Sequence, residues 1–305
     1  MIDKYGFGGT VACQVVSTWN ALTDTATINI PKKINWNGTV LNLSDNPIIK
    51  KGQKVSIAFG LNGNNNDWFT GFISQVFANK EAKINCQDEM FLLKTGDFTK
   101  SYESVKLSKL LKEMIGGKVK YEVTADFDLG QLRITRATPA QVLETLRKDY
   151  LVKSFVRAGT LYVGLAVVPK LQKRHEIKYV IESDLEYVRK EDTKIRIKGI
   201  ILNSKNEKKE FEYGDKDGEL RTIHAYNISE KELKKMCENE IETLRYSGFK
   251  GTFTTFIKPF VNHGDIIKLP KMYDVDTEGA YLVKTVTRSF DGTAARQIIE
   301  LDRKI

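Results

Sequence analysis

The sequence contains few of the residues on which metal sites, disulfide frameworks and most catalytic centres depend. Among its 305 residues there are only three cysteines and three histidines. The cysteines Cys13, Cys86 and Cys237 are far apart, odd in number and form no CxxC pair, so they predict neither a disulfide framework nor a zinc site. Cys86 lies in an alternating segment whose every second side chain faces inward. We expect all three to pack as small core residues.

Long apolar runs and a secretory leader are missing as well. The longest apolar run, residues 161–168, has about eight residues, whereas a membrane-spanning helix requires about 20. The N-terminus lacks the basic start and the apolar segment of a signal peptide. We therefore expect no membrane partner, and synthesis and retention in a cytoplasm.

Positive charge is in excess, but it is not concentrated. The net charge of +9 and the pI of about 9.2 are compatible with a nucleic-acid, an anionic-surface or an acidic-protein partner. Lysines and arginines alternate with acids, for instance in Lys-Asn-Glu-Lys-Lys-Glu at 205–210, so no long block of one sign emerges. No RNP, helix-turn-helix or zinc-finger pattern accompanies the charge, and we expect no sequence-specific nucleic-acid binding.

The first third of the chain has the pattern of short antiparallel strands. Residues 54–59 and 68–77 alternate between apolar and polar side chains, and the Asn-rich stretch 61–67 joins them as a hairpin. Closely spaced strands with no helical pattern between them favour a small barrel or sandwich. We assign residues 1–98 to a first β-barrel domain.

Between residues 99 and 168 the apolar period changes to that of helices. A first helix is predicted with Ser104 as its N-cap and Gly116 as its stop. Thr138 and Gln141 form the capping box of a second helix, which has proline at its first position. Strands surround both helices, and we assign 99–168 to a small α+β domain.

After residue 168 the alternating β pattern returns, with one interruption. Ser229 and Glu232 form a capping box, and an apolar stripe follows at helical spacing over about 229–246. We assign 169–305 to a second β-barrel domain with this inserted helix. The predicted fold class is therefore mainly β with α+β parts, in which two similar small barrels are connected by a small α/β domain.

A weak internal repeat supports the idea of two similar barrels. A glycine-turn strand, a loop, a long strand and a returning strand occur in this order twice, about 210 residues apart. The alternative is that any two β meanders look alike. The strand-entry and turn positions that define the repeat, and that we select as structural site residues, are Gly52, Gly71, Gly264, Asp265 and Gly279.

No constellation of reactive side chains emerges. His175, His224 and His263 lie in polar contexts that predict exposed or turn positions, without a metal-binding pattern. His263 is close to Asp265, but neighbouring residues at a strand entry point apart. The acidic loop 274–278 has calcium-site spacing but lacks the required glutamate twelve positions along. We assign no catalytic, cofactor-binding or metal residue and predict that the chain is not an enzyme.

The order of these elements resembles the baseplate hub family of contractile-tailed phages. That family includes the Mu-like hub proteins, the late-control D proteins and the hub portion of the VgrG spikes of type VI secretion. The segments that carry the resemblance are Lys51-Gly52-Gln53-Lys54-Val55, Phe69-Thr70-Gly71-Phe72-Ile73, the helix 138–146 followed by Phe155 and Gly159-Thr160-Leu161, Asn262-His263-Gly264-Asp265-Ile266-Ile267, and Gly279-Ala280-Tyr281-Leu282-Val283.

The resemblance implies a structural role in a phage or prophage tail. The chain would form a homotrimeric ring of paired barrels that joins the six-fold tail tube to the three-fold central spike. Its partners would be its own copies, the tail tube protein, the spike protein and the baseplate wedge proteins. It would be located in the virion tail baseplate, after synthesis in the bacterial host cytoplasm. Because the sequence ends at Ile305 without a β-helical needle, the spike is expected to be a separate protein.

Other functions stay open at this point. The same resemblance fits the hub of a related contractile injection system or the tail-tip protein of a non-contractile tail. From a different class, a β-rich carbohydrate-active enzyme would require a cleft with converging carboxylates or a metal. The affinity of an adhesion or nucleic-acid-binding module would fall steeply with salt if phosphates carried the binding.

Overall fold

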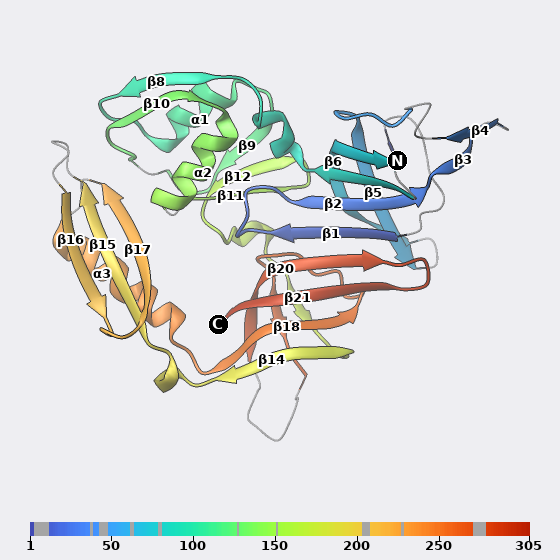
Figure 1. The fold of residues 1–305 in the computed structure, drawn as a ribbon. Helices are drawn as coiled ribbons and strands as arrows, with labels where there is room; N and C mark the ends of the chain where they lie inside the picture. The colour runs from blue at the N-terminus through green and yellow to red at the C-terminus, as the bar shows by residue number, and fades with distance from the viewer. Residues whose placement is uncertain are drawn as a thin grey trace.

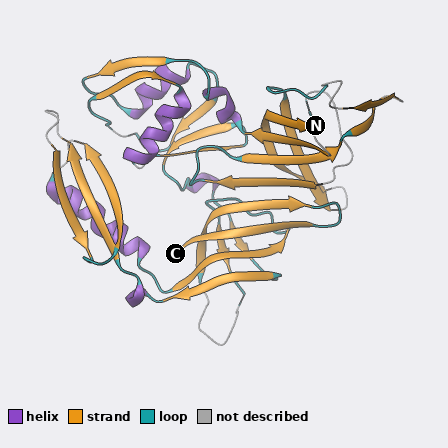
Figure 2. Cartoon of the chain, in the orientation of Figure 1, coloured by secondary structure: helices purple, strands orange, loops and turns teal. Residues whose placement is uncertain are grey.

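The computed structural model describes residues 1–2, 12–36, 39–42, 48–61, 64–78, 81–126, 128–150, 152–202, 208–226, 229–270 and 279–305. These residues are mostly β, with 21 strands and three α-helices. Figures 1 and 2 show two β regions one above the other, a helix-containing unit beside the first, and a separate sheet with one helix at the side. No helix in the described ranges is long and apolar enough to cross a membrane.

The first β region is an antiparallel sheet around its own apolar core. Its strands are β1 (Ala12–Thr18), β2 (Thr25–Pro31), β5 (Lys54–Leu61), β6 (Asn64–Ala78) and β7 (Glu81–Gln87), with the small hairpin β3 (Lys33–Trp36) and β4 (Thr39–Asn42) extending from it. The predicted hairpin is confirmed as β5 paired with β6. Val15, Ile73 and Ile84 are fully buried in the core, where the alternation of side chains places them.

The second β region has a similar build and a separate core. Its strands are β13 (Arg174–Glu176), β14 (Glu182–Val188), β18 (Gly248–Phe256), β19 (Ile266–Lys268), β20 (Ala280–Phe290) and β21 (Ala295–Lys304). Short 3-10 turns η2 (Pro169–Leu171) and η3 (Lys190–Asp192) flank β13 and β14. Phe253, Tyr281 and Ile299 belong to the buried cluster that this sheet covers.

The two β regions are joined in one continuous sheet, because β1 pairs with β20. The strand order is β14-β18-β21-β20-β1-β2-β7-β6-β5, with β19 beside β20. The predicted fold class is confirmed as mainly β with α+β parts. Closure into two separate barrels is not observed within the described ranges, where β14 and β5 form the two ends of the order.

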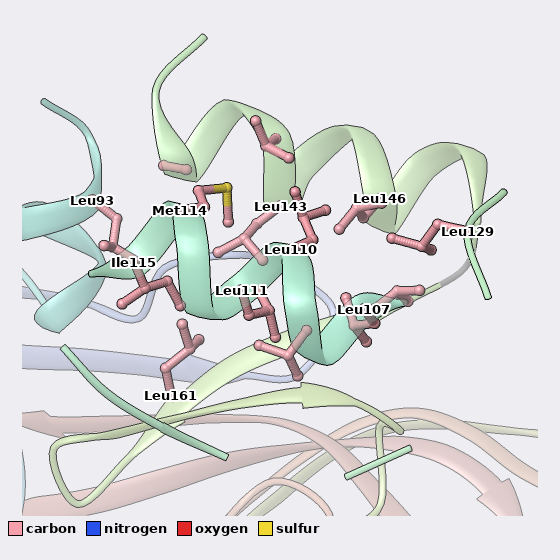
Figure 3. Close-up of a cluster of buried hydrophobic side chains, with 14 of the residues drawn as sticks. Leu93, Leu107, Leu110, Leu111, Met114, Ile115, Leu129, Leu143, Leu146 and Leu161 are labelled. Atoms are coloured by element: carbon pink, nitrogen blue, oxygen red, sulfur yellow. The ribbon is translucent and has the colours of Figure 1, made fainter. Parts of the chain in front are cut away.

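The helix-containing unit has the largest apolar core of the chain. It comprises η1 (Glu89–Leu93), β8 (Phe98–Tyr102), α1 (Leu107–Ile115), β9 (Lys120–Val123), β10 (Leu132–Ala137), α2 (Pro139–Asp149), β11 (Lys153–Arg157) and β12 (Thr160–Gly164). Figure 3 shows Leu110 of α1 and Leu143 of α2 pointing toward each other, with Leu161 of β12 on the other side of α1. Burial of such leucines is worth about 1.5–3 kcal/mol each.

The helix boundaries in this unit test two predicted caps. The capping box of α2 is confirmed, because Thr138 Oγ1 accepts the amide of Gln141 and Gln141 accepts the amide of Thr138. The predicted N-cap of α1 was wrong, since the helix starts after Lys106. Ser104 instead donates its hydroxyl to Asp128 at 3.2 Å.

A fourth unit interrupts the second β region. The strands β15 (Ile195–Leu202), β16 (Lys208–Gly214) and β17 (Glu219–Tyr226) form a separate three-stranded sheet, on which α3 (Glu230–Leu244) packs. The capping box of Ser229 and Glu232 is confirmed. Gly199 allows the close approach, because a Cβ there would lie 2.8 Å from the side chain of Leu233. Residues 195–244 thus add a sheet as well as the predicted helix.

Candidate assembly site

The two β regions contain the same five-strand arrangement. The first module, β1-β2-β7-β6-β5, has its strands in the sequential order first, second, fifth, fourth, third. The second module, β14-β18-β21-β20-β19, has the same order, and all neighbouring pairs in both modules are antiparallel. The predicted internal repeat is therefore confirmed, and it includes two strands more per module than the sequence indicated.

The strand-entry glycines occupy matching positions in the two modules. Gly52 donates its amide to the carbonyl of Ile73 at 2.8 Å, and Gly264 donates to Val283 at 2.7 Å. Both glycines have a left-handed backbone, with φ of 88° and 78°, which other residues adopt only with strain. Two segments 212 residues apart thus make the same turn onto the same point of the neighbouring strand.

The residue after each glycine caps its turn in the same way. Gln53 Oε1 accepts the amide of Lys50 at 2.6 Å, and Asp265 Oδ2 accepts the amide of Asn262 at 2.9 Å. Asp265 is one of the site residues predicted from the sequence, whereas Gln53 is not. The shared spacing from the glycine was the signal that identifies Gln53 as its counterpart.

The long strand of each module has an irregularity at the same place. The pairing of β6 with β7 shifts between Ile73 and Gln75, and that of β20 with β21 shifts between Val283 and Thr285. A bulge at a fixed position bends the strand and sets its register, so it is a strong indicator that two sheets share a common design.

The other two selected glycines do not match each other. Gly71 lies opposite Val55 in the pairing of β5 with β6, and the corresponding residue of the second module is Tyr281, opposite Ile267. A Cβ on Gly71 would lie 2.8 Å from the carbonyl carbon of Gln87, so this position tolerates glycine alone. Gly279 directly precedes β20, with the side chain of Lys304 against it.

The contact between the modules is an antiparallel strand pair. Residues Cys13–Thr18 of β1 pair with Thr285–Phe290 of β20. Val15 and Val286 are fully buried there. The indole of Trp19 donates to the carbonyl of Val283 at 3.3 Å. Main-chain pairing, apolar burial and a side-chain hydrogen bond together make this contact a built interface inside one chain.

A buried arginine supports the interface from the core side. Arg288 of β20 is 1% exposed. Its guanidinium donates to the carbonyl of Val261 and to Asn262 Oδ1, and it lies 4.0 Å from the centre of the Phe260 ring. Burial lowers the pKa of Arg288 to about 10, which leaves it charged at neutral pH. Its hydrogen bonds and ring contact offset part of the cost of burying that charge.

Two carboxylates lie on the first-module side of the same region. Asp24 accepts hydrogen bonds from the hydroxyl of Ser17 at 2.5 Å and the amide of Thr18 at 2.9 Å, and it keeps some exposure. Its own amide donates to Asp88, which is 2% exposed. Loss of hydration raises the pKa of Asp24 to about 6, and burial together with the charge of Asp24 raises the pKa of Asp88.

These carboxyls border a cavity between three parts of the chain. It has a volume of about 590 Å³ and lies where the first module, the α+β unit and the second module meet. Its charged lining consists of Asp24, Lys54, Asp67, Asp88, Glu89, Arg157 and Arg288. The cavity thus brings charges of both signs from the three parts to one place, where the positive charges of Arg157 and Arg288 lower the pKa of Asp24 against the larger effect of its burial.

The histidines differ from their predicted contexts. His263 was expected at an exposed or turn position, but its side chain is 1% exposed and packs edge-on against Phe155 at 4.9 Å. Burial keeps the pKa of His263 well below its ordinary value. Asp265 is fully buried and contacts His175 at 3.0 Å. The side chain of His224 and the acidic loop 274–278 lie outside the described residues.

The raised carboxyl pKa values predict a pH dependence of stability. A carboxyl that binds its proton more tightly in the folded state loses stability as pH rises through the interval between its unfolded pKa, about 4, and its folded pKa. The lowered pKa of His263 makes stability fall as pH decreases below about 6.5, which opposes the effect of the carboxyls. The prediction therefore compares the stability of a variant with that of wild type at each pH. Relative to wild type, Asp24→Asn should gain stability from pH 5 to pH 6, below the folded pKa of Asp24, and change little from pH 6 to pH 7.

Urea unfolding at pH 5, 6 and 7 measures this difference, with Asp291→Asn as the control. Asp291 is an exposed carboxylate whose pKa hydrogen bonds lower to about 2. It is ionised throughout the interval, so its variant should shift stability by a constant amount. If the difference in unfolding free energy between wild type and Asp24→Asn is the same at all three pH values, the raised pKa of Asp24 is wrong.

Among the described residues there is no group of three or more side chains able to hold a metal ion.

No protein-family model and no curated protein matches the sequence. Solved structures do match. The 43 kDa tail protein of prophage MuSo2 from Shewanella oneidensis is 15% identical with a TM-score of 0.66, over 99% of this chain and 96% of that one.

Two further structures have the same arrangement. A tail protein from Neisseria meningitidis MC58 is 12% identical with a TM-score of 0.65, over 97% of this chain and 92% of that one. The E. coli c3393 protein, a type VI secretion component described as similar to the T4 tail proteins gp27 and gp5, is 10% identical with a TM-score of 0.58, over 99% of this chain and 74% of that one. The chain therefore has the fold of phage and prophage tail proteins.

Proposed function

We propose that this protein is a structural baseplate hub of a phage or prophage tail. It forms a homotrimeric ring that joins the six-fold tail tube to the three-fold central spike. The observation that carries the proposal is the repetition of one five-strand module, with the same order, turn and bulge, twice in the chain. Three copies of such a chain present six similar modules around an axis, so one ring matches both symmetries.

In this proposal the chain has three parts, residues 1–98, 99–168 and 169–305, of which the first and the last contain the two similar β modules. The partners are the tail tube protein, the spike protein and the baseplate wedge proteins, and the location is the virion tail baseplate. The charged side chains of the chain serve protein contacts and hydration, with no catalytic role and no sequence-specific nucleic acid.

A hub of a related contractile injection system is the second candidate. The likeness to the E. coli type VI secretion component favours it, since that structure covers nearly all of this chain. Mass spectrometry of purified particles separates the two. Detection of the chain in infectious virions supports the phage role, whereas its presence only in non-infectious tail-like particles supports the second candidate.

The mass of the purified protein tests the trimer. One chain weighs 34.7 kDa, and we expect native mass spectrometry at tens of micromolar to give three times this mass as the main species. Dilution should shift the distribution toward the single chain without loss of fold. A protein that is entirely monomeric at that concentration would contradict the trimeric ring.

A further inference from the structure

The strand edge that joins the two modules inside one chain has an equivalent in the first module that is unpaired within the described ranges. In the second module, β20 pairs with β21 on one side and, through Thr285–Phe290, with β1 on the other. The corresponding segment of the first module is Gln75–Ala78 of β6, because Gln75 and Thr285 follow the matching bulges. It pairs with β7, and no strand within the described ranges pairs with its other side.

The strand that would complete this counterpart is present at the other end of the sheet. β14 has the place in the second module that β1 has in the first, since β1 pairs with β2 and β14 with β18 in matching registers. β1 is covered by β20, whereas β14 ends the described strand order. An unpaired strand edge is a template for pairing with another chain.

We propose that β14 of one copy pairs antiparallel with Gln75–Ala78 of β6 in the next copy. The register follows from the pairing of β1 with β20. It places Tyr187 opposite Val76, as Ser17 lies opposite Val286, and Glu186 opposite Phe77, as Val16 lies opposite Thr287. This inference rests on the proposed ring and defines the contact that holds its copies together.

The two edges carry apolar side chains that the isolated chain leaves open to solvent. Phe77 and Tyr187 are each 40% exposed and are among the largest exposed apolar residues. Val76 is half-buried at the border of the first-module core. In the proposed register Tyr187 covers Val76, so the contact removes apolar surface from water as well as pairing main-chain groups.

Each copy has one β14 edge and one β6 edge, so the contact between copies is head-to-tail. Such a head-to-tail contact forms a closed ring or an open filament, depending on whether its rotation closes. Because the contact between copies repeats the contact between modules, each copy contributes the eight strands from β14 to β6 to one continuous sheet. The same rotation then recurs at every module.

Disulfide trapping tests the register. The double variant Phe77→Cys with Glu186→Cys places two exposed cysteines opposite each other across the proposed contact. Under mild oxidation, non-reducing electrophoresis should show covalent dimers and trimers for most of the protein. The matched control is Phe77→Cys with Glu182→Cys, four residues along β14, which should give at least about tenfold less cross-linking because the Cβ atoms no longer meet. The native cysteines are buried and contribute little background.

The outcomes separate this inference from the proposed function. Trimers by native mass together with equal or absent cross-linking in both double variants would overturn the β6–β14 contact and leave the trimeric hub standing. A monomeric protein would overturn both. Strong cross-linking of the Glu186 pair alone supports the register.

A charge variant gives a second readout that does not depend on oxidation. Within one chain Phe77 lies opposite Lys83, whereas across the proposed contact it faces Glu186. Phe77→Glu should therefore weaken the trimer by about tenfold or more relative to Phe77→Lys, although the isolated chain favours the glutamate. Equal trimer dissociation constants for the two variants, or a weaker trimer for the lysine, would contradict the proposed register.

Discussion

Gly71→Ala is expected to destabilise the protein by about 3 kcal/mol or more, which is at the upper end for a single substitution. The added Cβ would lie 2.8 Å from the carbonyl carbon of Gln87 and would contact its oxygen more closely still. Both atoms belong to the main chain of β7 at the end of its pairing with β6, so they cannot move aside as a flexible side chain does. The free energy of urea unfolding measures the loss.

Gly52→Ala is the matched control for this variant. Gly52 lies in the same module and has nothing within 4 Å of the added Cβ, but its φ of 88° disfavours alanine. We expect a loss of about 1–2 kcal/mol from backbone strain. If Gly71→Ala costs no more than Gly52→Ala, the close approach of β7 to this glycine is wrong.

Arg288→Ala has the second largest expected effect, about 2–3 kcal/mol of unfolding free energy, from two acceptors left without a donor and from the cavity left behind. The substitution leaves the carbonyl of Val261 and the amide of Asn262 without their donor, and it empties the space above the Phe260 ring. Thermal or urea unfolding measures the loss. The reason is burial, since an exposed arginine in the same contacts is worth far less.

Arg296→Ala is the matched control, because Arg296 is a more exposed arginine in the same sheet. Arg296 lies on β21 and stacks over Phe256 at 5.0 Å, but it keeps access to water. We expect a loss below about 1 kcal/mol, the value of an exposed cation–ring contact. Similar losses for the two arginines would show that Arg288 is not the buried support of the contact between the modules.

The sequence predicted those parts of the fold that rest on local patterns. Capping boxes at Thr138 and Ser229 marked two helices, and the alternation around residues 54–77 marked the hairpin of β5 and β6. The turn glycines Gly52 and Gly264 revealed the repeat because only a left-handed turn needs glycine at that point.

The rest depended on contacts between distant segments. The first two strands of the repeat are consecutive in the first module, but residues 195–244 separate β14 from β18 in the second, which hid their equivalence. The continuous sheet through β1 and β20 leaves no local pattern either, so closed barrels were expected instead. Buried residues such as Arg288 and His263 have polar side chains, which predict exposure unless their partners are known.

The repeated module underlies the structural role that we propose. One sheet design, used twice, supplies a built contact inside the chain, with Arg288 and the pairing of β1 with β20 at its centre. In the proposed ring, the contact that joins the two modules in one copy is repeated between copies. In that ring, three copies would supply six similar modules.

Electron microscopy of the purified full chain tests the central claim most directly. If the two modules are equivalent and the chain forms a trimeric ring, class averages viewed along the axis should show a closed ring with six similar inner densities and a three-fold outer rim. Single particles with two unlike lobes, or open chains of copies without closure, would contradict it.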